Sequence, residues 1–380
     1  MEQDIDRFGR LFAVDALRGL LMALMALDHA NLFIAQKHSS GEYWGGPFPA
    51  YESALPFLTR FVTHLCAPGF FFLMGAGISL LARARLEKGW SRWAIVRRLW
   101  VRAALLIGLQ LLVINRAWEL SPAGWGIQVY IGVLFSLGCA MFWGSLLWGL
   151  DACYLVGIAV LLLPGTELLV PHLDLWGPDR GVVELFWLAP GGRPLGTEGG
   201  WLWVNYPILP WLELMALGLA FGQWLAIDSR KAFRYALVVG VVCLVAFAGV
   251  RALDGFGNIR PRAGDTWIDW LNVVKYPPSI AFTLLTLGID LVLLWLFSLL
   301  GGRGQKVAWP LAVFGRAPLF FYLTHAFLYL GMAYLLTPHG TSIPQMLPLW
   351  LLGLLLLLPL CWWYGRLRRR QPANSVLRLF

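Results

Sequence analysis

The stretch LFAVDALRGLLMALMALDHA at residues 11–30 decides the fold class of this chain. It is apolar over the length of about 20 residues that a helix needs to cross the hydrocarbon core of a bilayer. Ionisable residues are costly in such a helix, so Arg18 and His29 mark a function or a specific partner. Eleven helical positions separate them by about 16 Å along the axis. One helix could therefore hold an anion at one depth and present an imidazole near the opposite surface.

Composition predicts the class of the whole protein. The chain has 380 residues, of which 59% are hydrophobic and 13% are charged, and this balance leaves no room for a large soluble domain. We expect an all-α, polytopic integral membrane protein of about ten transmembrane helices. It should form a single domain over residues 1–380, ending in a short cytoplasmic tail at 372–380. The expected spans are 11–33, 55–81, 103–120, 127–148, 152–170, 206–227, 235–253, 277–300, 307–336 and 346–364.

The distribution of lysine and arginine predicts the orientation. If the N-terminus is cytoplasmic, 19 of the 30 basic residues fall on the cytoplasmic side, eight fall outside, and three lie within spans. This bias places both termini in the cytoplasm, and an even number of spans agrees with it. The net charge of +9 then reflects topology and anionic lipid headgroups, so we expect a bilayer partner and no nucleic acid.

Four motifs carry a resemblance to a known family. They are Val14-Asp15-Ala16-Leu17-Arg18-Gly19, Thr63-His64-Leu65-Cys66-Ala67-Pro68-Gly69-Phe70, Asn272-Val273-Val274-Lys275-Tyr276-Pro277-Pro278-Ser279 and Phe314-Gly315-Arg316-Ala317-Pro318-Leu319-Phe320-Phe321-Tyr322-Leu323-Thr324-His325. Together they resemble the bacterial branch of the heparan-alpha-glucosaminide N-acetyltransferase family, within the superfamily of transmembrane acyltransferases. The resemblance implies acyl transfer from a cytoplasmic acyl-CoA to an acceptor across the membrane.

Three residues are the candidates for binding the acyl donor. Arg18 suits the phosphates or the pantetheine of acetyl-CoA, because a guanidinium binds phosphate through a rigid fork and keeps its charge when desolvated. Asp15 lies three positions earlier on the same helical face, so an ion pair with Arg18 is the structural alternative. Arg316 is expected on a helix that also carries His325, at depths close to those of Arg18 and His29. These two helices could face one cavity.

Two histidines compete for the role of general base. His29 lies near the expected outer end of its helix, and a neutral imidazole can take a proton from an attacking amine or hydroxyl. His38 is the rival, because the resemblance places the proposed catalytic histidine of the lysosomal relative just after the first helix. Asp28 points about 100° away from His29. We therefore expect Asp28 to pair with a cation on another helix, either Arg60 or Arg116.

The remaining candidates are expected to support the site or to contact the acceptor: Arg60, His64, Lys275, Tyr276 and His325. For His64 and His325 a structural hydrogen bond is at least as good an explanation, because buried polar groups in lipid need partners. The prolines after Tyr276 fit the start of a helix. No paired metal-ligand motif is present, so we expect no metal.

The predicted function is therefore a membrane acyltransferase, and the alternative is a transporter or flippase for a small molecule or a lipid-linked sugar. A third hypothesis is an assembly subunit that has lost its chemistry. The enzyme hypothesis implies acetyl-CoA as donor, a glycan or glycolipid as acceptor, and a bacterial inner membrane as location. It also allows a homo-oligomer.

Overall fold

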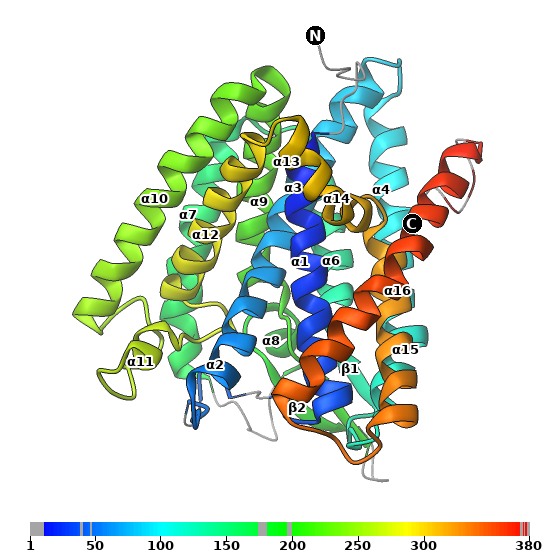
Figure 1. Cartoon of the computed structure of the whole chain (residues 1–380). Coiled ribbons are helices and arrows are strands. Elements are labelled where there is room, and N and C mark those ends of the chain that lie inside the picture. The colour runs from blue at the N-terminus through cyan, green and yellow to red at the C-terminus, as the bar shows by residue number, and fades with distance from the viewer. Residues whose placement is uncertain are drawn as a thin grey trace.

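The computed structural model describes residues 11–38, 41–45, 48–173, 181–195, 200–372, 375 and 377, which form a helical bundle (Figure 1). Within this described part, nine segments are long and apolar enough to cross a membrane. They are Phe12–Ala35, Ala54–Leu86, Arg92–Glu119, Ala152–Leu169, Ile208–Ile227, Ser229–Leu253, Ile280–Ser298, Pro318–Leu336 and Ile343–Arg370. A further apolar helix, α6 (Val133–Leu147), is shorter. The all-α, polytopic membrane class is confirmed.

Three of the long segments are built from several helical pieces. The first is α1 (Phe12–Ala30) with the π-helical turn η1 (Asn31–Ala35). The second is α2 (Ala54–Phe61), the 3-10 turn η2 (Val62–Leu65) and α3 (Cys66–Leu86). The third is α4 (Arg92–Leu109), η3 (Gln110–Ile114) and α5 (Asn115–Glu119). The six other spans are α7 (Ala152–Leu169), α9 (Ile208–Ile227), α10 (Ser229–Leu253), α12 (Ile280–Ser298), α15 (Pro318–Leu336) and α16 (Ile343–Arg370).

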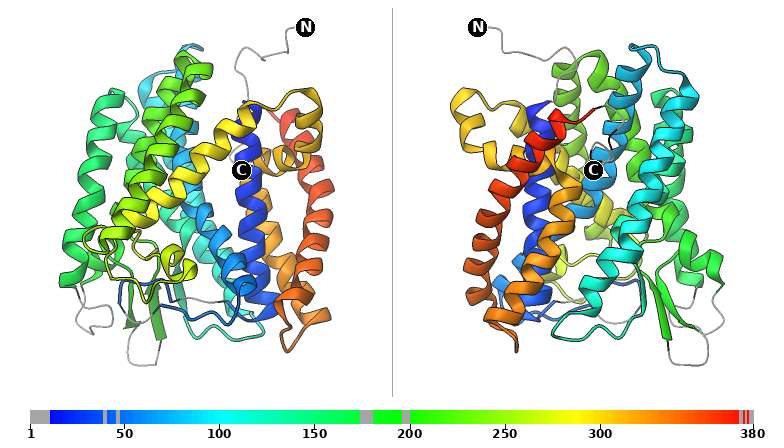
Figure 2. Two further views of the ribbon diagram at one scale, coloured as in Figure 1. Left: turned by 60° about the vertical axis from the view of Figure 1, so that its left-hand side comes forward. Right: turned by 90° about the vertical axis from the view of Figure 1, so that its right-hand side faces the viewer.

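The first helix occupies the middle of the bundle. It packs against α3, α12, α14 (Trp309–Arg316), α15 and α16, as the views of Figure 2 show. Most of its apolar window is buried, 72%, whereas only 17% of the window of α7 is buried. The helix that carries Arg18 and His29 is therefore enclosed by protein, and α7, α10 and α16 present apolar side chains outward.

Two glycines allow α14 to lie directly on α1. A Cβ atom added at Gly19 would stand 1.7 Å from the carbonyl oxygen of Leu311, and one at Gly315 would stand 1.9 Å from that of Asp15. Neither position tolerates a side chain, because both neighbours are backbone atoms. This close approach brings Arg316, at the end of α14, to Asp15 and Arg18 on α1.

The prediction of one continuous helix over 307–336 is wrong. The structure has a short helix α13 (Gly302–Val307), then α14, and a break at Ala317 before α15 begins at Pro318. Proline disfavours a helical conformation in the residue before it, and Ala317 accordingly leaves the helical region with φ −129° and ψ 50°. Arg316 and His325 therefore lie on different helices, although both remain against α1.

The expected span over 127–148 is also wrong at its start. Residues Val129–Ile131 form strand β1, and helix α6 follows only after Gly132. Strand β1 pairs in parallel with β3 (Gly200–Val204), which pairs antiparallel with β2 (Gly191–Leu195), so the order is β1-β3-β2. The part of the chain between α7 and α9 supplies β2 and β3 as well as helix α8 (Val182–Trp187). Another short helix, α11 (Trp267–Leu271), lies between α10 and α12.

The start of α1 and the end of α16 lie at the same end of the bundle, and the small sheet lies at the other end (Figure 1). This arrangement agrees with an even number of crossings. Only residues 372, 375 and 377 of the predicted tail are described, so the rest of the tail lies outside the described residues.

The charge distribution makes a prediction about topology. A single cysteine at Arg193 on β2, in a variant whose five native cysteines are replaced, should react with an impermeant thiol reagent in intact cells. A cysteine at Lys88, between α3 and α4, should react only after lysis. The opposite pattern at both positions would invert the orientation on which the donor and acceptor sides are assigned.

Candidate functional site

A basic cavity lies at the end of the bundle where α1 begins. Its volume is about 290 Å³, and four arginines from four helices line it: Arg18, Arg102, Arg316 and Arg368. Among the described residues, Asp15 is the only acidic side chain in the wall. The cavity therefore carries an excess of positive charge, and a phosphorylated ligand would neutralise it.

Asp15 holds two of these arginines in place. Its Oδ1 lies 3.4 Å from Nη1 of Arg18, and its Oδ2 lies 3.1 Å from Nε of Arg316. Arg18 also donates to the carbonyl oxygen of Gly315 at 3.0 Å, and Arg368 donates to that of Arg316 at 2.8 Å. The structural alternative for Arg18, an ion pair with Asp15, is thus present alongside its position on the cavity wall. Arg368 was not predicted as part of this site, because α16 returns to α1 only in the folded bundle.

The cavity extends toward the pair of histidines. Tyr322 lines it, and the Tyr322 ring makes an edge contact with His29, with 6.4 Å between centroids. Trp118 contacts His29 from another side, with centroids 5.0 Å apart. Neither aromatic residue was predicted as part of the site, because α5 and α15 meet α1 only in three dimensions.

His29 and His325 contact each other directly. Nδ1 of His29 lies 2.6 Å from Nε2 of His325, and the rings are stacked with 4.9 Å between centroids. His325 is completely buried, whereas His29 is half-buried. Arg18 and Arg316 line one cavity, and His29 contacts His325, so both pairs of residues meet across the packed helices.

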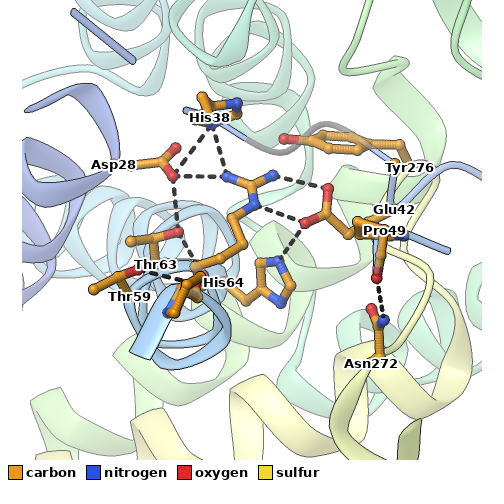
Figure 3. A network of polar contacts seen from close by, with 12 residues as sticks. Asp28, His38, Glu42, Pro49, Thr59, Thr63, His64, Asn272 and Tyr276 are labelled. Carbon is orange, nitrogen blue, oxygen red and sulfur yellow. Dashed lines mark hydrogen bonds and ion pairs between the residues drawn. The ribbon is translucent and has the colours of Figure 1, made fainter. Parts of the chain in front are cut away.

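Arg60 organises a second polar cluster, in which Asp28, His38, Glu42 and His64 lie close together (Figure 3). Its guanidinium is 2% exposed and donates to Asp28 at 2.7 Å and, through two nitrogens, to Glu42 at 2.7 and 3.0 Å. Of the two cations expected for Asp28, Arg60 is therefore the partner, whereas Arg116 pairs with Glu119. Thr63 donates to the same Asp28 oxygen at 3.0 Å. The carboxylates keep this buried arginine neutralised.

His38 belongs to this cluster rather than to an open loop. Its Nε2 lies 2.9 Å from Nη1 of Arg60 and 3.3 Å from Oδ1 of Asp28. The side chain is 20% exposed. His64 takes part from the opposite side, with Nε2 at 3.4 Å from Glu42. His38 thus contacts Asp28 from the segment after η1, whereas His29 follows Asp28 directly on α1.

Glu42 was missed in the sequence, where it reads as an ordinary loop residue. Its side chain is fully buried. Burial acts to raise the pKa of the Glu42 carboxyl, but the Arg60 guanidinium and the hydrogen bond with His64 hold this pKa well below its ordinary value. Nothing in the local sequence marks Glu42, because its ion pair with Arg60 joins a loop to a separate helix.

The segment before α12 secures Glu42. The backbone amides of Lys275 and Tyr276 donate to the Glu42 carbonyl at 2.9 and 3.1 Å. The Tyr276 ring stacks on Tyr43 with 5.0 Å between centroids, and Lys275 is 3% exposed. Lys275 and Tyr276, both predicted from the sequence, therefore lie beside the cluster around Arg60.

A second cavity, the outer cavity, opens at the end of the bundle where the small sheet lies. Its volume is about 480 Å³, and its wall includes Asn31, Lys37, Tyr51, Glu52 and Arg60. Arg60 therefore borders both this cavity and the cluster around Asp28. In the described part of the chain, no three His, Cys, Asp or Glu side chains come together as a metal site would require.

These features define an integral membrane protein of the all-α class, with a cationic cavity at one end, a polar cavity at the other, and histidines between them. The chain belongs to the heparan-alpha-glucosaminide N-acetyltransferase family. The model of that family's catalytic region, described as "Heparan-alpha-glucosaminide N-acetyltransferase, catalytic", matches residues 10–256. The family resemblance seen in the sequence is confirmed.

Two curated relatives are similar to part of this chain. The heparan-alpha-glucosaminide N-acetyltransferases of Homo sapiens and Mus musculus are 30% and 31% identical to it over 133 residues. The match covers 35% of this chain and 18% of each relative. This chain therefore spans less than a fifth of the length of the curated relatives that it matches.

Proposed function

We propose that this protein transfers an acetyl group from cytoplasmic acetyl-CoA to an amino or hydroxyl group of an externally presented glycan. The observation that carries the proposal is the continuity from the cationic cavity, through Tyr322, to His29. The distribution of lysine and arginine predicts that this cavity faces the cytoplasm. We place the protein in a bacterial inner membrane, whose anionic lipids suit the arginines that end α16.

The donor side follows from charge. Arg18, Arg102, Arg316 and Arg368 offer fixed guanidinium forks to the phosphates of the CoA moiety. The remainder of the wall is mostly apolar, which suits the pantetheine arm. Acetyl-CoA bound in this way would direct its thioester away from the cytoplasm and toward His29.

The chemical step needs one base. The acceptor nitrogen or oxygen attacks the thioester carbonyl carbon, His29 takes the proton from the attacking atom, and the carbon–sulfur bond breaks. The proton then passes to the CoA thiolate, so CoA leaves as the free thiol and His29 returns to its neutral form. Direct transfer needs a single bound arrangement of the two substrates. The outer cavity beside Lys37 and Glu52 is the proposed place of the glycan acceptor.

His38 remains the second candidate for the base. Its Nε2 lies within the cluster formed by Arg60 and Asp28, and its neighbour Lys37 borders the outer cavity. Variants of the two histidines separate these assignments.

The donor assignment predicts protection from heat. Acetyl-CoA at about 100 times its Kd should stabilise the purified protein by roughly 2.7 kcal/mol, because the ligand binds only the native state. Arg18→Ala should abolish this protection, and Arg18→Lys should restore part of it, since an ammonium cannot reproduce the guanidinium fork. The measurement is the unfolding temperature in detergent with and without acetyl-CoA.

Arg83→Ala is the matched control, because Arg83 is an exposed arginine that pairs with Glu87 away from the cavity wall. It should keep full protection. Equal protection of the Arg18→Ala variant would remove Arg18 from the donor site. A wild-type protein that binds acetyl-CoA without ever releasing thiol would favour the transporter alternative.

A further inference from the structure

The contact between His29 and His325 also determines where the ring hydrogens of the two residues lie. The two ring nitrogens are 2.6 Å apart, so one of them must donate a hydrogen and the other must accept it. For two neutral imidazoles, each ring carries one N–H and one lone pair. The direction of this hydrogen bond therefore decides which nitrogen of His29 is free to act as a base.

The other nitrogen of His325 settles that direction. Its Nδ1 lies 2.9 Å from the carbonyl oxygen of Phe321. A carbonyl oxygen can only accept, so Nδ1 of His325 carries the hydrogen and donates it. Nε2 of His325 then carries the lone pair and accepts the hydrogen bond. Nδ1 of His29 must therefore carry the hydrogen and donate it.

From this we infer that His325 is a positioning residue, which holds His29 in the tautomer whose Nε2 lone pair is free to take the acceptor proton. Among the described residues, His29 makes its side-chain hydrogen bond through Nδ1, and none involves Nε2. The inference rests on the proposed function, because it assigns a role relative to the proposed base. It extends that function by naming the group that prepares the base.

The surroundings keep this arrangement in place. His325 is 0% exposed, so water does not compete for its Nε2. The rings of Phe321 and Tyr329 on the same helix pack against it, with 5.4 and 6.3 Å between centroids. Trp118 blocks a second side of His29. Imidazole free in water exchanges its tautomers readily, and a dry acceptor at a fixed distance removes that freedom.

The direct test is the protonation pattern of His29 in the wild-type protein. Nitrogen-15 NMR of the histidine-labelled protein in lipid at pH 7.5, with the His29 signals assigned by their loss in His29→Gln, distinguishes protonated from bare ring nitrogens. We expect a neutral His29 with its hydrogen on Nδ1 and a bare Nε2. A hydrogen on Nε2, or a doubly protonated ring, would overturn the inference without any activity measurement.

Variants supply the second test. His325→Leu removes the acceptor and should slow thiol release from acetyl-CoA by about 10- to 100-fold, since part of a base's worth depends on its tautomer and orientation. His325→Gln places an amide oxygen near the position of Nε2 and should recover the rate to within a few-fold of wild type. Tyr329→Phe is the control, because it removes a neighbouring buried hydrogen bond, 2.8 Å to the carbonyl of Trp350, without touching His29. It should leave the rate unchanged.

The outcomes separate this inference from the proposed function. If His29→Ala is inactive while His325→Leu and His325→Gln both match wild type, His29 is the base and His325 does not position it. Equal losses in the Leu and Gln variants, with the NMR pattern of His29 unchanged, would make His325 a packing residue only. If His29→Ala keeps full activity, the base assignment fails, and the tautomer seen by NMR still tests the hydrogen bond itself.

Discussion

His29→Ala is expected to slow thiol release from acetyl-CoA by about 10²- to 10⁴-fold, the usual contribution of a general base. The physical reason is that the attacking amine, hydroxyl or water must lose a proton as it bonds to the thioester carbon. Purified protein with a thiol reagent gives the readout, because water can replace a missing acceptor at the same base.

The matched experiment is His38→Ala under the same conditions. If His29 is the base, the His38 variant should lose little, and both variants should keep protection by acetyl-CoA, since neither touches the arginine cavity. An inactive His38→Ala beside an active His29→Ala would assign the role to His38, held by Asp28 and Arg60. Full activity in both variants would exclude base catalysis by either histidine.

Glu42→Ala is expected to lower the free energy of unfolding by roughly 3–5 kcal/mol, because it leaves the buried Arg60 guanidinium with one carboxylate instead of two. Unfolding in detergent measures the loss. The pKa of Glu42 is depressed in the folded protein, so its contribution is complete above the ordinary carboxyl pKa and declines as pH falls through the folded value. The difference between wild type and variant should therefore stay constant across neutral pH.

Glu87→Ala is the control for this prediction. Glu87 also pairs with an arginine, at 3.3 Å, but both side chains are about half exposed. Such a pair contributes about 0–1 kcal/mol because solvent screens it. If Glu42→Ala lowers the free energy of unfolding no more than Glu87→Ala does, the cluster around Arg60 does not stabilise the loop that carries Glu42.

The candidate site was predictable where its residues share a helix. Arg18 and His29 follow from one apolar segment, and the cost of charge in lipid singles them out without any tertiary information. The pairing of Asp28 with a cation on another helix also follows, because the aspartate points away from His29, but the choice of Arg60 over Arg116 required the structure. Partners from distant segments did not follow in the same way. Glu42 and Arg368 carry no periodic signal, and their roles depend on which surface the chain folds against.

The break at Ala317 illustrates a second limit. The apolar run over 307–336 is long enough for one helix, and Pro318 was compatible with a kink or a break. The structure shows a break at Ala317, and the close approach at Gly19 lets the short helix α14 lie against α1. Arg316, at the end of α14, thereby contacts Asp15, whereas His325 lies on the next helix, α15.

The sequence alone determined the membrane class and the spacing of Arg18 and His29 along one helix, because hydrophobic length and the cost of burying charge act locally. Its motifs carried the resemblance to the family. The tertiary structure alone decided the four-arginine cavity, the contact between His29 and His325, and the carboxylates that neutralise Arg60. These depend on hydrogen bonds and ion pairs that act over about 3 Å, and only the packing of segments up to hundreds of residues apart brings such partners within that distance.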